Sequence, residues 1–544
     1  MAWTTARRCV LGASLLLGGC GAAVTPDGDG PDDSVPDGVD TDPAADSDTD
    51  LEPSGSAMLR RLTTWELDRV IVHQLGLDPG LASAMLPPDP LTPFDNEVAW
   101  QDPSPVLLEA LERLGTEAGA QVAADPALRE RLTGCGPSAG VDCVVDSLPV
   151  VLRRALRRPV APAELAPWAE LVTDAGSALG VPGAVHALVA VLLQHPEVVY
   201  RIEGTGDDGL ADGPTVASRM AFLLWGSAPD DALLDAAEQG VLATAEGRAA
   251  EARRLLADPR AREQVRRFHA QWLGYERLHI TGDWEVPVRV QADALIDRVV
   301  FDDRRPWVEV LTLPFQYIND AMSPHYGLPT PSPGADGFGW VSAAGADREG
   351  ILATAAFLMA SSHTLDTSPT LRGKLLLERL LCDPPDPPPA NVNADAPPPL
   401  SEATCKLDRY EAHRTNPSCA RCHEQMDALG EGLERYDRAG GYRLYDVDQD
   451  TEEFVTSCPL PQGATVPDLG TYRDVGELGA LLASTGRASD CVVEHLVAYA
   501  FGSGEGTDHP ELLASLQGTF REQPYLDDLL VAMVAAPDFV EVRP

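Results

Sequence analysis

Apolar residues recur at helical spacing along most of the chain after residue 57. In the first such segment, one face of a predicted helix carries Leu62, Leu67, Val70, Ile71 and Leu75. Thr63 or Thr64 can cap the start of this helix, and Gly76 can end it. Between residues 181 and 278 the alternating pattern of strands is almost absent. The pattern therefore predicts an all-α fold.

The same spacing predicts helices over 104–118, 350–363 and 370–382, and four more over 473–541. Two further helices are expected to break at Pro159 and Pro162, with the arginines of 153–158 on a solvated face. Turn residues and short apolar pieces allow a strand hairpin near 441–458. The stretch 383–400 is rich in proline and is expected to be extended rather than helical.

A chain of 544 residues is too long for one ordinary core, so we expect several domains. The predicted order is a signal segment (1–20), a disordered acidic linker (21–57), N-terminal helical modules (58–178), a central helical module (179–280), an irregular connecting region (281–345), a module that contains a Cys-x-x-Cys-His motif (346–445) and a C-terminal helical module (446–544).

The N-terminus has the features of an export signal. Arg7 and Arg8 precede a short apolar run, and the run ends in the sequence LLGGC at Cys20. Such an ending is typical of bacterial lipoproteins, in which the cysteine is lipidated. We therefore expect an exported protein that contacts a membrane only through lipid on Cys20, in the outer membrane and periplasm or at the cell surface.

Charge and motifs exclude several classes of function. The formal net charge is -43, which makes nucleic acid an improbable partner. The sequence has no H-E-x-x-H and no phosphate-binding glycine loop of the type G-x-x-x-x-G-K-[ST]. It therefore predicts no catalytic residue, and whether the protein is an enzyme stays open.

An oxidising compartment favours disulfides. Apart from Cys9, Cys20 and one Cys-x-x-Cys-His motif, the chain has six cysteines: Cys135, Cys143, Cys382, Cys405, Cys458 and Cys491. Their order suggests the pairs Cys135–Cys143, Cys382–Cys405 and Cys458–Cys491. Six cysteines allow fifteen arrangements, so the pairing stays open.

Cys419, Cys422 and His423 form the Cys-x-x-Cys-His motif, which is the attachment signal for c-type haem. On a helix, residues three apart lie on one face, so both thiols can reach one porphyrin, and the histidine can bind the iron. A thioredoxin-like redox pair would need a βαβ context, and a zinc site would need a second ligand pair. A plain disulfide or structural thiols remain as alternatives.

The sixth iron ligand is less well defined. The candidates are Met359, His363 and His413, although core packing or an ordinary hydrogen bond is the more common role for each such residue. Arg372 and Arg443 could meet the haem propionates, and ordinary surface roles are at least as plausible for both.

The motif stands in the sequence NPSCARCHEQMDALGEGLERYDRAGGYR. This segment resembles the cytochrome-c-like module of large exported multi-module proteins of planctomycete type. Other segments after residue 57, including RLTTWELDRVIVHQLG and DCVVEHLVAYAFGS, resemble further modules of these proteins. One departure is Ala428, which stands where the pattern has proline. The resemblance implies haem c, with its iron, and export, but no substrate.

Together these features predict an exported lipoprotein with one covalent haem that transfers single electrons to an unknown partner protein. If the sixth position is open, peroxide or oxygen chemistry is an alternative. The competing hypothesis is a non-redox binding or scaffolding lipoprotein whose Cys-x-x-Cys-His motif is structural.

Overall fold

Helices make up most of the chain that the structure describes. The computed structural model describes residues 59–101, 103–206, 209–278, 280, 282–363, 366–387, 405–447, 451, 453–503 and 506–542. In these residues it has the helices α1 to α21 and four two-stranded antiparallel sheets, which confirms the all-α prediction. The predicted signal, Cys20, the acidic linker and most of the proline-rich stretch lie outside the described residues.

The first group of elements packs around its own hydrophobic core, which includes Leu67, Leu114 and Leu188. Thr63 caps α1 through the amide of Glu66, as predicted, and Gly76 ends the following turn with a φ of 78°. The elements are β1 (Arg60–Arg61), α1 (Thr64–Val70), α2 (Leu81–Met85), α3 (Pro105–Ala124), α4 (Pro126–Thr133), α5 (Val141–Leu156), α6 (Pro162–Leu192), α7 (Pro196–Val199) and β2 (Tyr200–Arg201), which pairs with β1.

Among the described helices, α6 alone is long and apolar enough to cross a membrane by length and composition. Its backbone leaves helical geometry at Gly180, where φ is 71°. Val172, Val185 and Leu188 on this helix are fully buried, and α6 packs along α3 and α5. These buried contacts account for part of its apolar character.

The central group forms part of a second, larger core. Asp212 caps α8 and Asp230 caps α9 through their side chains. The elements are α8 (Gly213–Trp225), α9 (Asp231–Glu238), α10 (Ala245–Leu256), α11 (Pro259–Trp272), α12 (Glu285–Asp297), β3 (Phe315–Ile318), α13 (Met322–Tyr326) and β4 (Gly339–Ser342), which pairs with β3.

The third group holds the Cys-x-x-Cys-His motif. Its elements are α14 (Ala355–Ala360), α15 (Pro369–Leu380), α16 (Asp408–Thr415), α17 (Pro417–Glu431), β5 (Tyr445–Val447), β6 (Phe454–Pro459), β7 (Ala464–Val466) and β8 (Gly470–Tyr472). β5 and β6 pair antiparallel, which confirms the hairpin expected near 441–458.

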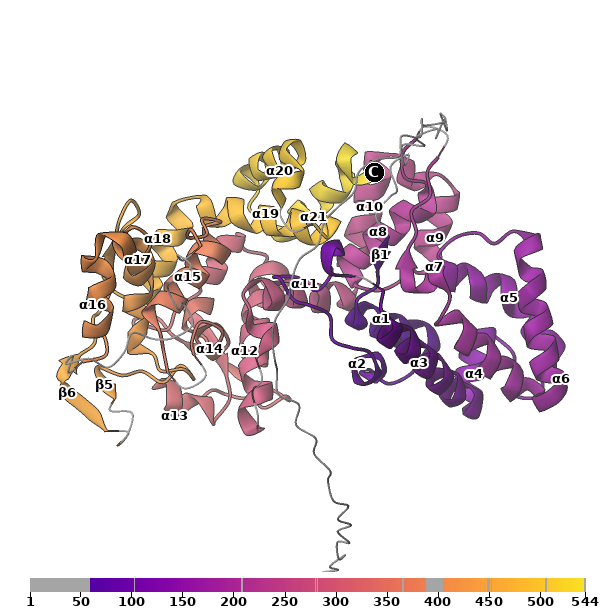
Figure 1. Ribbon diagram of the computed structural model, residues 1–544, viewed down its shortest axis with the longest axis horizontal. Helices are drawn as coiled ribbons and strands as arrows, with labels where there is room; N and C mark the ends of the chain where they lie inside the picture. The colour runs from indigo at the N-terminus through magenta and orange to yellow at the C-terminus, as the bar shows by residue number, and fades with distance from the viewer. Residues whose placement is uncertain are drawn as a thin grey trace, which may run out of the picture. The chain divides into compact units, whose positions relative to one another are not determined.

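The four C-terminal helices are α18 (Val475–Ser484), α19 (Arg487–Phe501), α20 (Pro510–Glu522) and α21 (Leu526–Ala535). They contact both neighbouring groups: α19 packs against α15, and α21 packs against α10 (Figure 1). Arg248 of α10 donates hydrogen bonds to the carbonyls of Val534 and Ala535 at the end of α21. The last helices therefore join the central group to the group that holds the motif.

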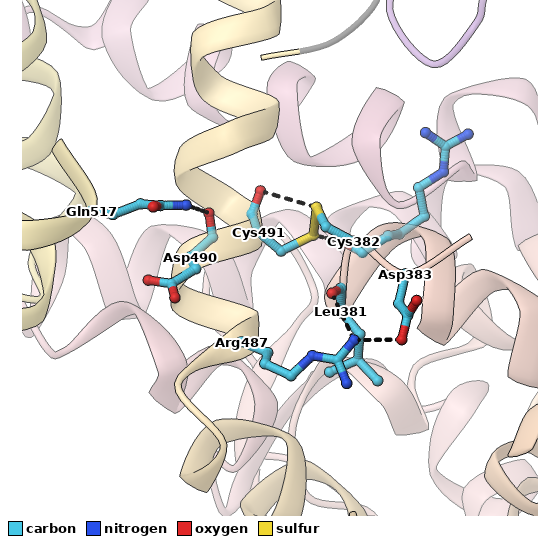
Figure 2. Close-up of a disulfide and its surroundings, with 8 residues drawn as sticks. Leu381, Cys382, Asp383, Arg487, Asp490, Cys491 and Gln517 are labelled. Atoms are coloured by element: carbon cyan, nitrogen blue, oxygen red, sulfur yellow. Dashed lines mark hydrogen bonds and ion pairs between the residues drawn. A yellow bond between two sulfur atoms is a disulfide. The ribbon is translucent and has the colours of Figure 1, made fainter. Parts of the chain in front are cut away.

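All six candidate cysteines form disulfides, but only one of the pairs suggested by sequence order is correct. Cys135 pairs with Cys143 as suggested. Cys382 pairs with Cys491 instead of Cys405, because the end of α15 packs against α19. Arg487 reinforces this junction by donating to Leu381 O and to the carboxylate of Asp383 (Figure 2).

The remaining pair is Cys405–Cys458, so the suggested Cys458–Cys491 bond is also wrong. The backbone N–H of Lys406 donates to Asp446 on β5, which holds this stretch of chain along the β5–β6 hairpin. Tertiary packing, and not proximity in the sequence, decides both pairings.

Candidate functional site

The Cys-x-x-Cys-His motif lies in the first half of α17. Cys419 and Cys422 are the two unbonded cysteines among the described residues, and both are half-buried. They are three residues apart on one α-helix, so their side chains share a face. Two reduced thiols thus stand one turn apart, with His423 directly after the second.

His423 is oriented by a buried carboxylate. Its Nδ1 lies 3.2 Å from Oδ1 and 3.3 Å from Oδ2 of Asp427, whose side chain is fully buried. Thr370 of α15 donates a hydrogen bond to the same Oδ1 at 2.6 Å. With Nδ1 donating to this carboxylate, Nε2 is the ring nitrogen left for a metal. Metal-binding histidines are typically held in this way.

A second imidazole lies beside the first. The ring of His413, on α16, is centred 4.2 Å from that of His423. Burial, and then the charge of His423, lower the pKa of His413. Its Nδ1 is buried without a hydrogen-bond partner among the described residues. Ligand atoms of His413, His423 and Asp427 lie within 4.8 Å of one another.

The ring spacing distinguishes two kinds of metal coordination. With metal–nitrogen bonds of about 2 Å, two imidazoles on opposite sides of one iron hold their ring centres roughly 6 Å apart. At 4.2 Å the two rings have the spacing of neighbouring ligands of one ion. As placed, His413 is not spaced as the sixth ligand of a haem bound to His423.

The structure places one of the three sixth-ligand candidates, His413, beside His423. Met359 packs against the large hydrophobic core. His363 is not part of the His413–His423–Asp427 group. The sequence thus offered three candidates for the sixth iron ligand, and the fold brings His413 next to His423.

Residues 348–446, which contain the motif, match a family model. It is PSCyt3, a protein of unknown function (DUF1588). Residues 212–328 match a second model, PSD4, also a protein of unknown function (DUF1592). No curated protein and no solved structure matches the chain. The chain is thus a multi-module protein with two domains from families of unknown function.

A buried ionic network supports the PSCyt3 domain behind α17. Glu434 is fully buried and forms three ion pairs. Its carboxylate lies 3.0 Å from the ammonium group of Lys406, and 3.1 Å and 3.5 Å from the guanidinium groups of Arg372 and Arg443. Arg372 also donates to the carbonyls of Leu433 and Tyr436. Both arginines that the sequence offered for haem propionates are thus engaged inside the protein.

Close helix packing holds α17 against α15. A Cβ atom on Gly373 would lie 1.6 Å from the carbonyl oxygen of Met426, and one on Gly430 would lie 1.9 Å from that of Pro369. Only glycine permits this approach of the two backbones. It also brings Thr370 within reach of Asp427.

Asp427 is the site residue that sequence reasoning missed. It stands four residues after His423, and this spacing puts both on one helical face. The spacing alone was a usable signal, but the burial of Asp427 and its bond to Thr370 depend on the packing of α15.

The donor set fits a covalently attached haem. Two free thiols share a helix face, and Nε2 of the adjacent histidine is available when Nδ1 donates to Asp427. His423, together with His413 and Asp427, also suits a single metal ion.

Proposed function

We propose that α17 of the PSCyt3 domain carries one covalent c-type haem and that the protein transfers single electrons. Cys419 and Cys422 would form the thioether bonds, and His423 would bind the iron. The observation that carries the proposal is the pair of reduced thiols beside an oriented histidine, in a domain where the other described cysteines are paired.

When bound, the haem supplies a reversible one-electron exchange at its iron. Asp427 holds the proton on Nδ1 of His423 and fixes the orientation of the ring. It also makes Nε2 a more basic ligand for the iron. The charge network around Glu434 and the contact between α15 and α17 keep the helix in place. The electron partner is an unknown protein.

The predicted signal and lipid on Cys20 complete the proposal, with the protein attached to a membrane in an exported compartment. Cys20→Ala should release the protein from the membrane fraction without changing its haem content. Cell fractionation followed by immunoblotting measures the release from the membrane, and haem staining measures the haem content.

A second candidate is a mononuclear metal site formed by His413, His423 and Asp427, in which Nδ1 of His423 would bind the ion instead of donating a hydrogen bond to Asp427. The 4.2 Å spacing of the two rings and the unpartnered Nδ1 of His413 favour it. Two histidines and one carboxylate are common ligands of iron and zinc.

One experiment separates these candidates. The full chain is produced with a cytochrome c maturation system, and covalent haem is measured by haem stain and mass spectrometry, with metals measured by elemental analysis. We expect one haem per chain, lost in the variant Cys419→Ser with Cys422→Ser and retained in His413→Ala. His363→Ala is the matched control and should retain haem.

The opposite result would support the mononuclear site: metal without haem, lost in His413→Ala and kept in the double cysteine variant. A chain with neither haem nor metal would leave the non-redox scaffold as the explanation. Far-UV circular dichroism of each variant shows whether the fold is intact.

A further inference from the structure

The PSD4 domain contains a polar cleft away from the motif. The cleft has a volume of about 230 Å³ and lies between α11, α12 and the turn that holds Tyr275, with Trp65 of α1 on its rim. This volume holds many water molecules but is smaller than the pockets of drug-sized ligands. We call it the PSD4 cleft.

Arginines that are already paired line the PSD4 cleft. Arg266 donates through Nε to Asp297 at 2.9 Å. Arg267 donates to Glu276 at 2.9 Å and also bonds Asp95. These carboxylates fix the guanidinium groups and balance their charge. Each guanidinium has five N–H donors, so donors remain for a ligand.

Arg289 is held in a similar way. It lies 3.5 Å from the carboxylate of Glu276 and donates to the carbonyls of Glu276 and Leu278. Three arginines and three acidic residues line the cleft altogether. The cleft therefore has no strong net charge to attract an ion.

Two neighbouring polar groups of the cleft, Asp293 and Tyr275, take no part in these ion pairs. Asp293 makes no ion pair among the described residues, although Arg266 and Arg289 lie near it. Burial, more than any neighbouring charge, raises the pKa of Asp293 to about 6. Tyr275 is 1% exposed, and its hydroxyl has no hydrogen bond of good geometry within the described chain. Burial and the nearby Asp293 raise the pKa of Tyr275.

The buried hydroxyl of Tyr275 has no hydrogen bond of good geometry, and such a group marks a place where a ligand or water can complete the hydrogen bonding. Fixed donors from arginine alternate here with carboxylate acceptors. An anion would compete with the carboxylates that hold the arginines, and a cation would meet three guanidinium groups. Hydroxyl groups, which both donate and accept, match such a lining.

We propose that the PSD4 cleft binds a neutral, polyhydroxylated small molecule of about the size of one sugar ring. Arg289 and Arg266 would donate to its hydroxyl oxygens, and Asp293 would accept from its hydroxyl groups. Trp65 and Ala270 would supply the apolar wall. This site is independent of the haem proposal.

Binding to the full chain is tested by saturation-transfer NMR and titration calorimetry at constant ionic strength. The probes are a panel of neutral hexoses and pentoses, with sodium sulfate and putrescine as charged comparators. We expect at least one neutral sugar to bind the wild type, and Arg289→Met to weaken its binding at least tenfold.

Arg305→Met is the matched control. Arg305 is similarly exposed, at 36% against 32% for Arg289, and it pairs with Asp303 and Glu309 outside the cleft. This variant should bind the sugar normally. If Arg289→Met does not fold, Tyr275→Phe replaces it, because that change removes only the hydroxyl and should also weaken binding.

Three results would overturn the proposal. The first is that no sugar binds the wild type. The second is that sulfate or putrescine binds better than every sugar and this binding is lost in the cleft variant. The third is that Arg305→Met weakens sugar binding as much as Arg289→Met does.

Discussion

At the scale of single residues, the PSCyt3 domain is distinguished by a cluster of buried charged side chains. Glu434 is fully buried among Lys406, Arg372 and Arg443. Burial alone would raise the pKa of Glu434, but the three cations outweigh it and lower the pKa to about 2. The carboxylate is therefore ionised in the folded protein, and it compensates cations that would otherwise be buried without a partner.

Replacing Glu434 by Gln should destabilise the protein by about 3–5 kcal/mol near neutral pH, because the buried cations lose their counter-charge. The folded pKa lies below the unfolded value, so the stabilisation is fully present above about pH 4.5 and declines as the pH falls toward 2. Urea unfolding at pH 7 and pH 3 should show a smaller difference between variant and wild type at the lower pH.

Glu477→Gln is the control for this prediction. Glu477 pairs with Arg473 at an exposed position, so its replacement should change stability little. A loss from Glu434→Gln no larger than that from the control would contradict the role given to the buried network.

At the scale of elements, the contact between α15 and α17 positions the motif. Gly373 and Gly430 let the backbones of the two helices approach. Thr370 on α15 then reaches Asp427, which in turn orients His423. The geometry of the candidate site thus depends on two residues without side chains.

Gly373→Ala should lower stability by about 2 kcal/mol or more, because the new Cβ would overlap the carbonyl oxygen of Met426 and force the helices apart. Thermal or denaturant unfolding measures the change. Gly518→Ala on α20 is the control: a Cβ there meets nothing within 4 Å, and alanine favours the helix by up to about 1 kcal/mol. Equal stability of Gly373→Ala and wild type would show that the helices are free to separate.

At the scale of the whole described molecule, the C-terminal helices join the two family domains. α19 is linked to the end of α15 by Cys382–Cys491 and by Arg487, and α21 contacts α10 of the PSD4 domain (Figures 1 and 2). A bond between residues 109 apart in sequence restricts the unfolded chain strongly.

Removing Cys382–Cys491 by replacing both cysteines with Ala should cost about 2 kcal/mol more than removing Cys135–Cys143 in the same way. The chain-entropy model gives a larger effect for the longer loop, since Cys135 and Cys143 are only 8 residues apart. Urea unfolding of both double variants checks the order. A larger loss from the short-loop variant would argue against this account of the stability.

The sequence by itself determined the elements and the ends of many helices. Thr63 caps α1 and Asp230 caps α9 as their residue types predict, since both satisfy amides of the first turn from within their own segment. The Cys-x-x-Cys-His motif also needed no tertiary information, because the spacing of Cys419 and Cys422 fixes their common face on α17.

Only the tertiary structure decided which distant residues meet. Arg157, expected on a solvated face, is buried and donates to carbonyls of Val198 and Tyr200. Cys382 bonds Cys491 rather than the nearer Cys405, and His413 comes to lie beside His423. Helical periodicity and caps depend on residues that are close in the sequence, so a short segment is enough to predict them. Disulfide partners, buried charges and the lining of the PSD4 cleft depend instead on how complete helices pack.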